Sequence, residues 1–234
     1  MFGVNAVLLI DHAWGYERCT IAQIRAYKPQ SSSLGCGQVL PCPYTADKAR
    51  IVVQEMIDGI SLELVEKRLV TDQLVLTVGY DIENLTRPEI RKVYKGPMTT
   101  DRYGRRVPKH AHGTWNLPRA TSSSSELLEA MAALYVNPAL VIRRMSLSAC
   151  HVVNEKMAKE REQKETFEQL DLFTDYAKKE AKEKEEQKKR ERERRMQEAL
   201  LTIKKKYGKN AVLRGMNFEE GATAKERNGQ IGGH

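Results

Sequence analysis

Two hydrophobic periodicities alternate along the middle of the chain. Residues 46–64 place apolar side chains three and four positions apart, which is the spacing of one covered face of an α-helix. Other stretches alternate apolar with small or polar residues, which is the period of a half-covered β-strand. The expected strands are residues 34–40, 74–80, 113–117 and 141–152, and the second expected helix follows Thr121.

The order of these elements is strand, helix, strand, strand, helix, strand. That is the split βαβ pattern (βαββαβ), and it predicts an α+β fold. We expect a four-stranded antiparallel sheet with two helices on one face and the other face free.

Single residues refine these elements. Pro41 and Pro43 are expected to end the first strand, and Thr45 is a good N-cap for the first helix. Four polar residues of that helix lie mostly off its apolar stripe: Gln54, Glu55, Asp58 and Glu66.

The ends of the chain differ from its middle. Residues 2–27 are apolar and helix-like, and residues 81–112 form a long polar stretch. A charged helix is expected over residues 176–207, with its second half docked on the domain. Residues 208–234 contain six glycines and are expected to be irregular when alone.

Charge is concentrated in that helix. The chain has a net charge of +8, and residues 176–206 hold 13 basic and 7 acidic residues. Such a segment is typical either of a solvated helix or of a helix near nucleic-acid phosphates. No apolar run approaches the roughly 20 residues of a membrane span. The four cysteines form no CxxC pair, which favours reduced thiols in a cytoplasmic chain and no metal site.

Six segments together resemble the C-terminal part of Y-family translesion DNA polymerases, of the UmuC/ImpB/MucB/SamB type found in Gram-positive bacteria. Their order and spacing carry the resemblance. They are residues 2–15 (FGVNAVLLIDHAWG), 33–40 (SLGCGQVL), 76–81 (LTVGYD), 101–114 (DRYGRRVPKHAHGT), 208–210 (GKN) and 227–234 (RNGQIGGH).

The resemblance implies a division of the chain and a missing part. Residues 1–28 would end the thumb subdomain, residues 29–155 would form the little finger domain, and residues 156–234 a charged helical tail. The catalytic palm, with its two magnesium ions, would precede residue 1, so this fragment is not expected to be catalytic. The parent enzyme would act in DNA repair and the SOS response.

In this family the little finger grips primer–template DNA along its backbone, which requires phosphate contacts rather than base readout. Basic and small polar residues on the open sheet face and in the loop before the third strand are therefore candidates. They are Arg102, Arg105, Arg106, Lys109, Thr114, Asn116, Arg144, Ser146 and Ser148.

A short motif in the tail resembles the pentapeptide by which bacterial polymerases bind the sliding clamp. A few apolar anchors that fill a pocket on the partner are sufficient for such binding. The motif consists of Gln169, Leu170, Asp171, Leu172 and Phe173.

A different class of function stays open. The α/β domain could be a stand-alone module that binds protein or RNA through its sheet face, with the charged helix mediating assembly. Aromatic residues on the open face would favour an RNA reader that stacks bases. The sequence places mostly Ser, Thr, Asn and Arg there.

Overall fold

The computed structural model describes residues 5–17, 19–27, 32–101, 104–132, 139–165 and 176–230. The chain divides into two compact units, residues 1–31 and 32–234. The smaller unit contains α1 (Asn5–Ala13) and α2 (Ile21–Ala26). The apolar N-terminal segment is therefore interrupted between these helices, where Gly15 has a positive φ of 74° and Thr20 begins α2 with a capping box.

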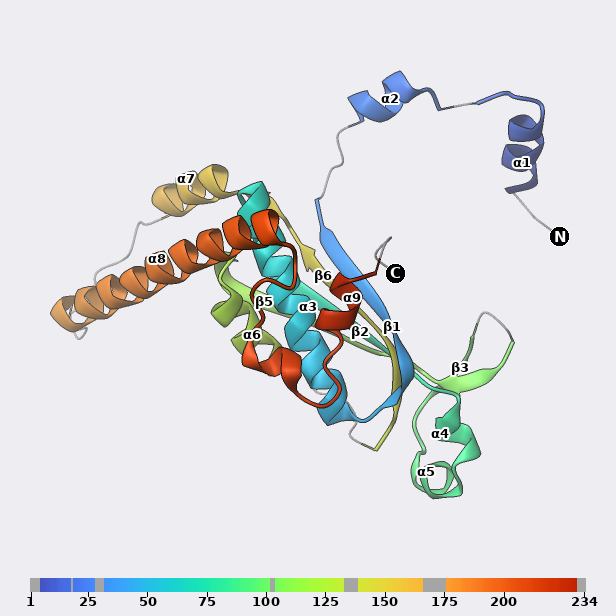
Figure 1. Ribbon diagram of the computed structural model, residues 1–234. Coiled ribbons are helices and arrows are strands. Elements are labelled where there is room, and N and C mark those ends of the chain that lie inside the picture. The colour runs from blue at the N-terminus through green and yellow to red at the C-terminus, as the bar shows by residue number, and fades with distance from the viewer. Residues whose placement is uncertain are drawn as a thin grey trace. The chain divides into compact units, whose positions relative to one another are not determined.

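The larger unit is built on an antiparallel sheet in the order β1–β6–β2–β5 (Figure 1). Because each neighbouring pair is antiparallel, β1 and β2 run in the same direction with β6 between them. The predicted α+β class with an antiparallel sheet is confirmed. The strands are β1 (Leu34–Tyr44), β2 (Leu69–Tyr80), β5 (Ala111–Thr121) and β6 (Ile142–Cys150), and the short β7 (Val153–Asn154) pairs with the start of β2.

Two helices, α3 (Ala46–Lys67) and α6 (Ser124–Ala132), cover one face of this sheet. Alternate residues of β2 and β6 point to these helices and are buried, as their sequence alternation predicts. The core includes Leu74, Leu76, Val78, Met145, Leu147 and Ala149 from the strands, and Val52, Met56, Ile60, Leu64, Leu127 and Met131 from the helices.

The first strand continues through its prolines, so the expectation that Pro41 and Pro43 end it is wrong. β1 lies at the edge of the sheet, and its register with β6 shifts between Val39 and Tyr44. A proline on an edge strand or at a bulge removes no ladder hydrogen bond, which explains why it is tolerated here.

The polar stretch 81–112 is also more regular than expected. It forms α4 (Glu83–Thr86), α5 (Pro88–Val93) and a hairpin of β3 (Met98–Thr100) with β4 (Arg106–Pro108). Asn84 is buried and connects this region to β6, because its side-chain amide donates to the carbonyl of Val141 and accepts from the Val141 N–H, each at 2.8 Å.

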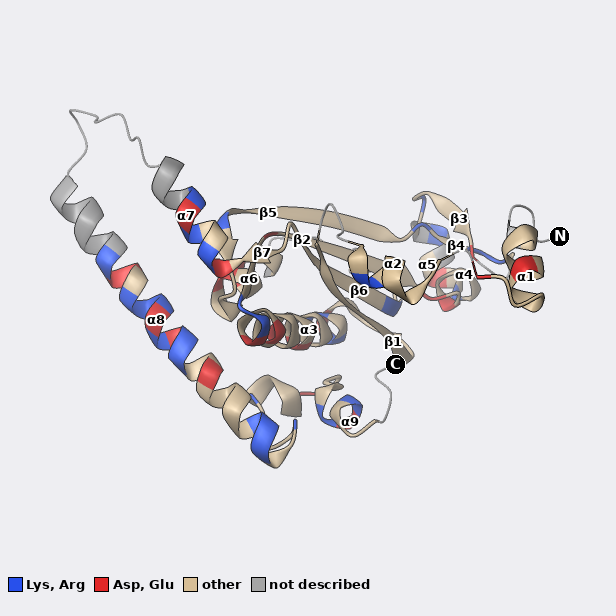
Figure 2. Cartoon of the chain, turned by 90° about the horizontal axis from the view of Figure 1, so that it is seen from above, with Lys and Arg blue, Asp and Glu red and all other residues tan. Residues whose placement is uncertain are grey.

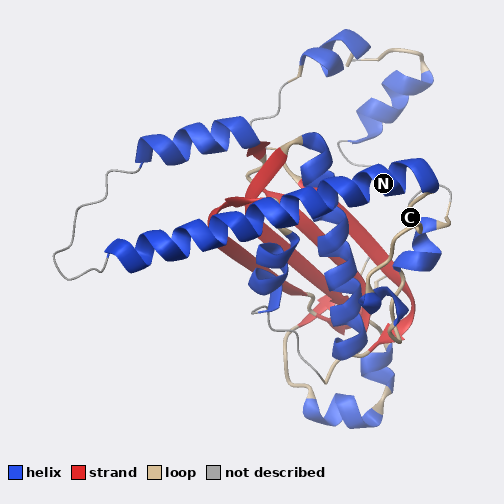
Figure 3. Ribbon diagram, turned by 60° about the vertical axis from the view of Figure 1, so that its left-hand side comes forward, coloured by secondary structure: helices blue, strands red, loops and turns tan. Residues whose placement is uncertain are grey.

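A third layer covers the outer side of α3. It consists of α8 (Tyr176–Tyr207), the 3₁₀ helix η1 (Gly215–Phe218) and α9 (Ala224–Asn228) (Figures 2 and 3). The preceding α7 (Glu155–Glu165) follows β7. The second half of α8 docks on α3, as predicted, and Gln197 is fully buried there.

This layer explains why the sequence pattern misplaced Glu55. Glu55 lies off the apolar stripe of α3 but is buried, because the C-terminal segment covers it. Its Oε2 accepts hydrogen bonds from the N–H groups of Thr223 and Ala224, both at 2.9 Å, and its Oε1 accepts from Asn217 at 2.8 Å. Residues 208–230 are thus held by a specific polar contact despite their glycine content.

Within the described residues, no helix is both long and apolar enough to cross a bilayer.

Candidate nucleic-acid interface

The sheet face opposite α3 and α6 carries small and polar side chains. We call it the open face. Cross-strand register aligns these residues in rows, for example Gly37, Ser146, Thr77 and His112 from β1 to β5. Alternation places Gly35, Gly37, Val39, Gln73, Val75, Thr77, Gly79, His112, Thr114, Asn116, Arg144, Ser146 and Ser148 on the open face, and this set contains no carboxylate.

Five of the predicted DNA-binding residues lie together on this face. Thr114 and Asn116 are exposed on β5, and Arg144 and Ser146 are exposed on β6, with Ser148 half-buried beside them. Gln73, Thr77 and His112 were not predicted, although the same alternation could have identified them.

Cross-strand hydrogen bonds orient part of the open face. Gln73 Nε2 donates to Asn116 Oδ1 at 2.8 Å, and Thr77 Oγ1 lies 3.0 Å from His112 Nδ1. These pairs join β2 to β5 through side chains as well as through the backbone. The polar groups are consequently held in position on the sheet rather than on mobile loops.

Arg144 lies across the neighbouring strand because Gly79 leaves room for it. A Cβ atom at Gly79 would be 2.7 Å from Arg144 Cγ and 2.9 Å from Nε, so any larger residue would displace the arginine. The glycine thus keeps this cationic side chain close to the sheet surface.

The basic residues of the hairpin are separate from this cluster. The hairpin forms its own two-stranded sheet beyond the end of β2 (Figure 1). Arg106 and Lys109 are exposed, whereas Arg105 forms an ion pair with Asp101 at 2.7 Å, which offsets its charge. Arg102 lies outside the described residues, as does the predicted clamp motif, residues 169–173.

A second polar site, which the sequence did not reveal, lies where α8 docks at the start of α6. The Glu193 carboxylate accepts hydrogen bonds from the hydroxyls of Ser123, Ser124 and Ser125 at 2.6, 2.9 and 2.7 Å, and from the Ser125 N–H at 3.0 Å. A carboxylate is favourable here because a helix N-terminus carries unsatisfied N–H groups. We call this contact the Glu193 seat.

Burial alone would raise the pKa of Glu193, but the serine hydrogen bonds outweigh it and hold the pKa below its ordinary value. The serine run 122–125 was a sequence signal for an N-cap, but not for a partner from α8. Glu193 is almost 70 residues away in the chain, so only the tertiary fold brings it to these serines.

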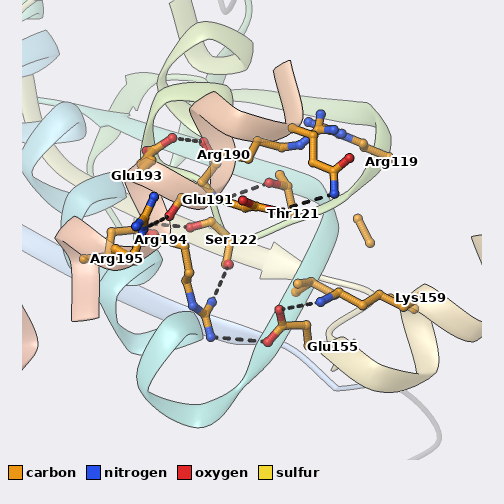
Figure 4. Close-up of a pocket in the computed structure, with 16 residues that line it drawn as sticks. Arg119, Thr121, Ser122, Glu155, Lys159, Arg190, Glu191, Glu193, Arg194 and Arg195 are labelled. Carbon is orange, nitrogen blue, oxygen red and sulfur yellow. Dashed lines mark hydrogen bonds and ion pairs between the residues drawn. The ribbon is translucent and has the colours of Figure 1, made fainter. Parts of the chain in front are cut away.

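A cleft of about 780 Å³ adjoins the Glu193 seat between α7, α8 and the end of β5 (Figure 4). Several of its charged residues take part in ion pairs and hydrogen bonds. Arg194 contacts Glu155 at 3.2 Å and Ser122 at 3.1 Å, Glu155 contacts Lys159 at 3.4 Å, and Arg119 pairs with Glu126. Arg194 thereby joins α8 to the start of α7 and to the residue after β5.

The described residues contain no group of three or more His, Cys, Asp or Glu side chains placed to hold a metal ion. All four cysteines are unpaired, and burial raises the pKa of the Cys36 thiol to about 11, so it stays protonated at neutral pH. His112 and Cys36 are on opposite faces of the sheet, so they do not converge.

No protein-family model matches the chain, and no curated protein matches its sequence significantly.

Proposed function

We propose that this chain is the DNA-binding and clamp-tethering region of a Y-family translesion DNA polymerase. The observation that carries the proposal is the open face. It is rich in hydrogen-bond donors, it contains Arg144, and its thirteen residues named above include no acidic side chain.

This composition suits a nucleic-acid backbone. Hydroxyl, amide and guanidinium groups are the usual partners of phosphate oxygens, and such contacts position a protein without reading sequence. A carboxylate on the same face would repel phosphates. The paired side chains of β2 and β5 would contact the backbone with little loss of side-chain entropy, because they are already held.

The open face favours backbone contact over base stacking. An RNA reader of the stacking kind requires aromatic side chains on its sheet. The open-face residues include no Phe, Tyr or Trp, and their single imidazole, His112, is held by Thr77 at 3.0 Å. The register pairs Trp115 with Leu74, on the side of the helices. The alternative that remains is a stand-alone module that binds another protein through this face.

Replacement of Arg144 by alanine is expected to weaken binding to a primer–template duplex about tenfold. Loss of one phosphate contact should also lower the slope of log affinity against log salt by about 1. Fluorescence anisotropy at several salt concentrations measures both quantities. The matched control is Arg50→Ala, which removes an exposed arginine from α3 in the helical layer. Equal affinities for the two variants would contradict a DNA-binding open face.

For the tether, we expect the chain to bind a bacterial sliding clamp, and the double substitution Leu172→Ala and Phe173→Ala to weaken this binding at least tenfold. The two residues would be the apolar anchors that fill the clamp pocket. Surface plasmon resonance with immobilised clamp measures the change, and Glu160→Ala, an exposed residue of α7, is the control. If the intact chain does not bind the clamp, tethering is excluded, and the DNA-binding part then depends on the Arg144 result alone.

In this proposal the chemistry resides in another part of the polymerase. Its palm would hold the carboxylates and two magnesium ions for nucleotidyl transfer in the cytoplasm. The present chain would hold the duplex and raise the effective concentration of the enzyme at the primer end through the clamp.

A further inference from the structure

The two sides of α8 have different chemistry from Lys184 onward. The side that faces α3 and α6 is half-buried or buried, and it includes Arg190, Glu193, Arg194, Gln197, Leu200, Leu201 and Lys204. The outward side repeats every three or four residues, and all of its members are exposed. We call it the α8 stripe: Lys184, Lys188, Arg192, Arg195, Ala199, Thr202 and Lys206.

Docking contacts fix the rotation of α8 about its axis. The Glu193 seat holds one point of the inward side. One turn later, the Gln197 amide donates to the Ser122 carbonyl at 3.1 Å and to Ser61 Oγ at 3.3 Å, and it is buried. A helix held at two successive turns presents a constant outward side, so the α8 stripe is a defined surface.

Cationic side chains follow one another along the outward side of this helix. A helix that is merely solvated carries both signs on its outward face. Here the stripe contains five cations and no acid. Acidic residues of the same stretch are not members of the stripe: Glu193 occupies its seat, Glu198 pairs with Arg194 at 3.0 Å, and Glu185, Glu186 and Glu191 are exposed beside it. The α8 stripe itself is therefore a positively charged line, with acidic residues only beside it.

The dimensions of the α8 stripe fit a linear polyanion. Residues four apart are about 6 Å apart along the axis, and the stripe from Lys184 to Lys206 spans about 33 Å. That is close to one turn of B-DNA, roughly 34–36 Å. An anionic membrane fits less well, because an interfacial helix needs a broad apolar face, whereas Ala199 is the one apolar residue of the stripe.

We propose that the α8 stripe is a second binding surface for the backbone of duplex nucleic acid. The helix α3 lies between the sheet and the second half of α8 (Figure 2). Because the stripe is on the side of α8 opposite its contacts with α3, it faces away from the open face. One straight duplex cannot reach both surfaces. The chain therefore holds a second duplex segment, and this inference does not depend on the open face binding DNA.

The test compares two triple variants of the full chain with the same loss of charge. One is Lys188→Gln, Arg192→Gln and Arg195→Gln in the α8 stripe. The control is Arg50→Gln, Lys156→Gln and Lys225→Gln, at exposed positions of α3, α7 and α9. Circular dichroism verifies that both are folded, and titration with a short duplex gives stoichiometry and salt dependence.

We expect the stripe variant to lose one equivalent of bound duplex, and the salt slope to fall by about 2 to 3, since each phosphate contact contributes roughly 0.9. The control variant should keep the stoichiometry and the salt slope of the wild-type chain. Identical behaviour of the two variants would overturn the proposal, and so would stripe-dependent binding to anionic vesicles without loss of duplex. If instead the open face does not bind DNA, Arg144→Ala has no effect, while the stripe variant abolishes binding.

Discussion

Replacement of Glu55 by glutamine is expected to lower the free energy of unfolding by about 3 kcal/mol. The Glu55 carboxylate is buried and accepts hydrogen bonds from the backbone of Thr223 and Ala224 and from Asn217. Hydrogen bonds to a charged group contribute about 1.5–3 kcal/mol each, and unsatisfied buried donors cost about 1–3 kcal/mol. A glutamine NH₂ would meet either the backbone N–H groups of Thr223 and Ala224 or the Asn217 NH₂, so donors would face each other in both orientations of the amide.

Urea unfolding measures this change, and hydrogen exchange localises it. Residues 208–230 should exchange much faster in the Glu55→Gln variant, while β2 and β6 keep their relative protection. Glu66→Gln is the matched control, since Glu66 is an exposed residue of the same helix whose ion pair with Lys205 contributes little. Unchanged exchange in residues 208–230 would show that Glu55 does not hold this segment.

The substitution Glu193→Gln is expected to lower the free energy of unfolding by about 2 kcal/mol. It should also increase the rate of hydrogen exchange in the second half of α8. Glutamine keeps the shape of the side chain but loses the charge that the serine hydroxyls and the start of α6 stabilise. The expected loss is smaller than for Glu55, because Glu193 is only half-buried and solvent screens part of its interaction.

The contribution of Glu193 should depend on pH in a defined direction. Its pKa is lower in the folded state than its ordinary value, so the unfolded chain binds this proton more readily. The stability difference between wild type and Glu193→Gln should be complete above the ordinary glutamate range of about 4.3 and should disappear as the pH falls below it.

Thermal unfolding from neutral to acidic pH tests this dependence. Glu198→Gln is the control, because Glu198 is on the same helix but its side chain is 53% exposed, so solvent screens its ion pair with Arg194. A difference between wild type and Glu193→Gln that is constant with pH would contradict a charged seat. Faster hydrogen exchange of α8 in the Glu193→Gln variant would also show that the Glu193 seat orients the α8 stripe.

The strands and their faces could be predicted from local sequence. Leu74, Leu76 and Val78 alternate with Val75, Thr77 and Gly79, and the first set forms the core. The prediction also placed Arg144, Ser146 and Ser148 on a single face, because side-chain direction in a strand has a period of two. The local pattern did not show that β1 lies at the edge of the sheet. Pro41 and Pro43 are tolerated there because an edge strand does not need both of its sides for ladder hydrogen bonds.

The sequence by itself thus determined the α+β class and the polar character of the open face. Only the tertiary structure decided which polar helix residues are covered, since Glu55 and Glu193 meet partners that are distant in the chain. The spacing of apolar residues in a helix shows which side of the helix packs against the sheet. A second layer, such as α8 and α9 over α3, changes the environment of polar residues without altering the pattern that a helix shows in sequence.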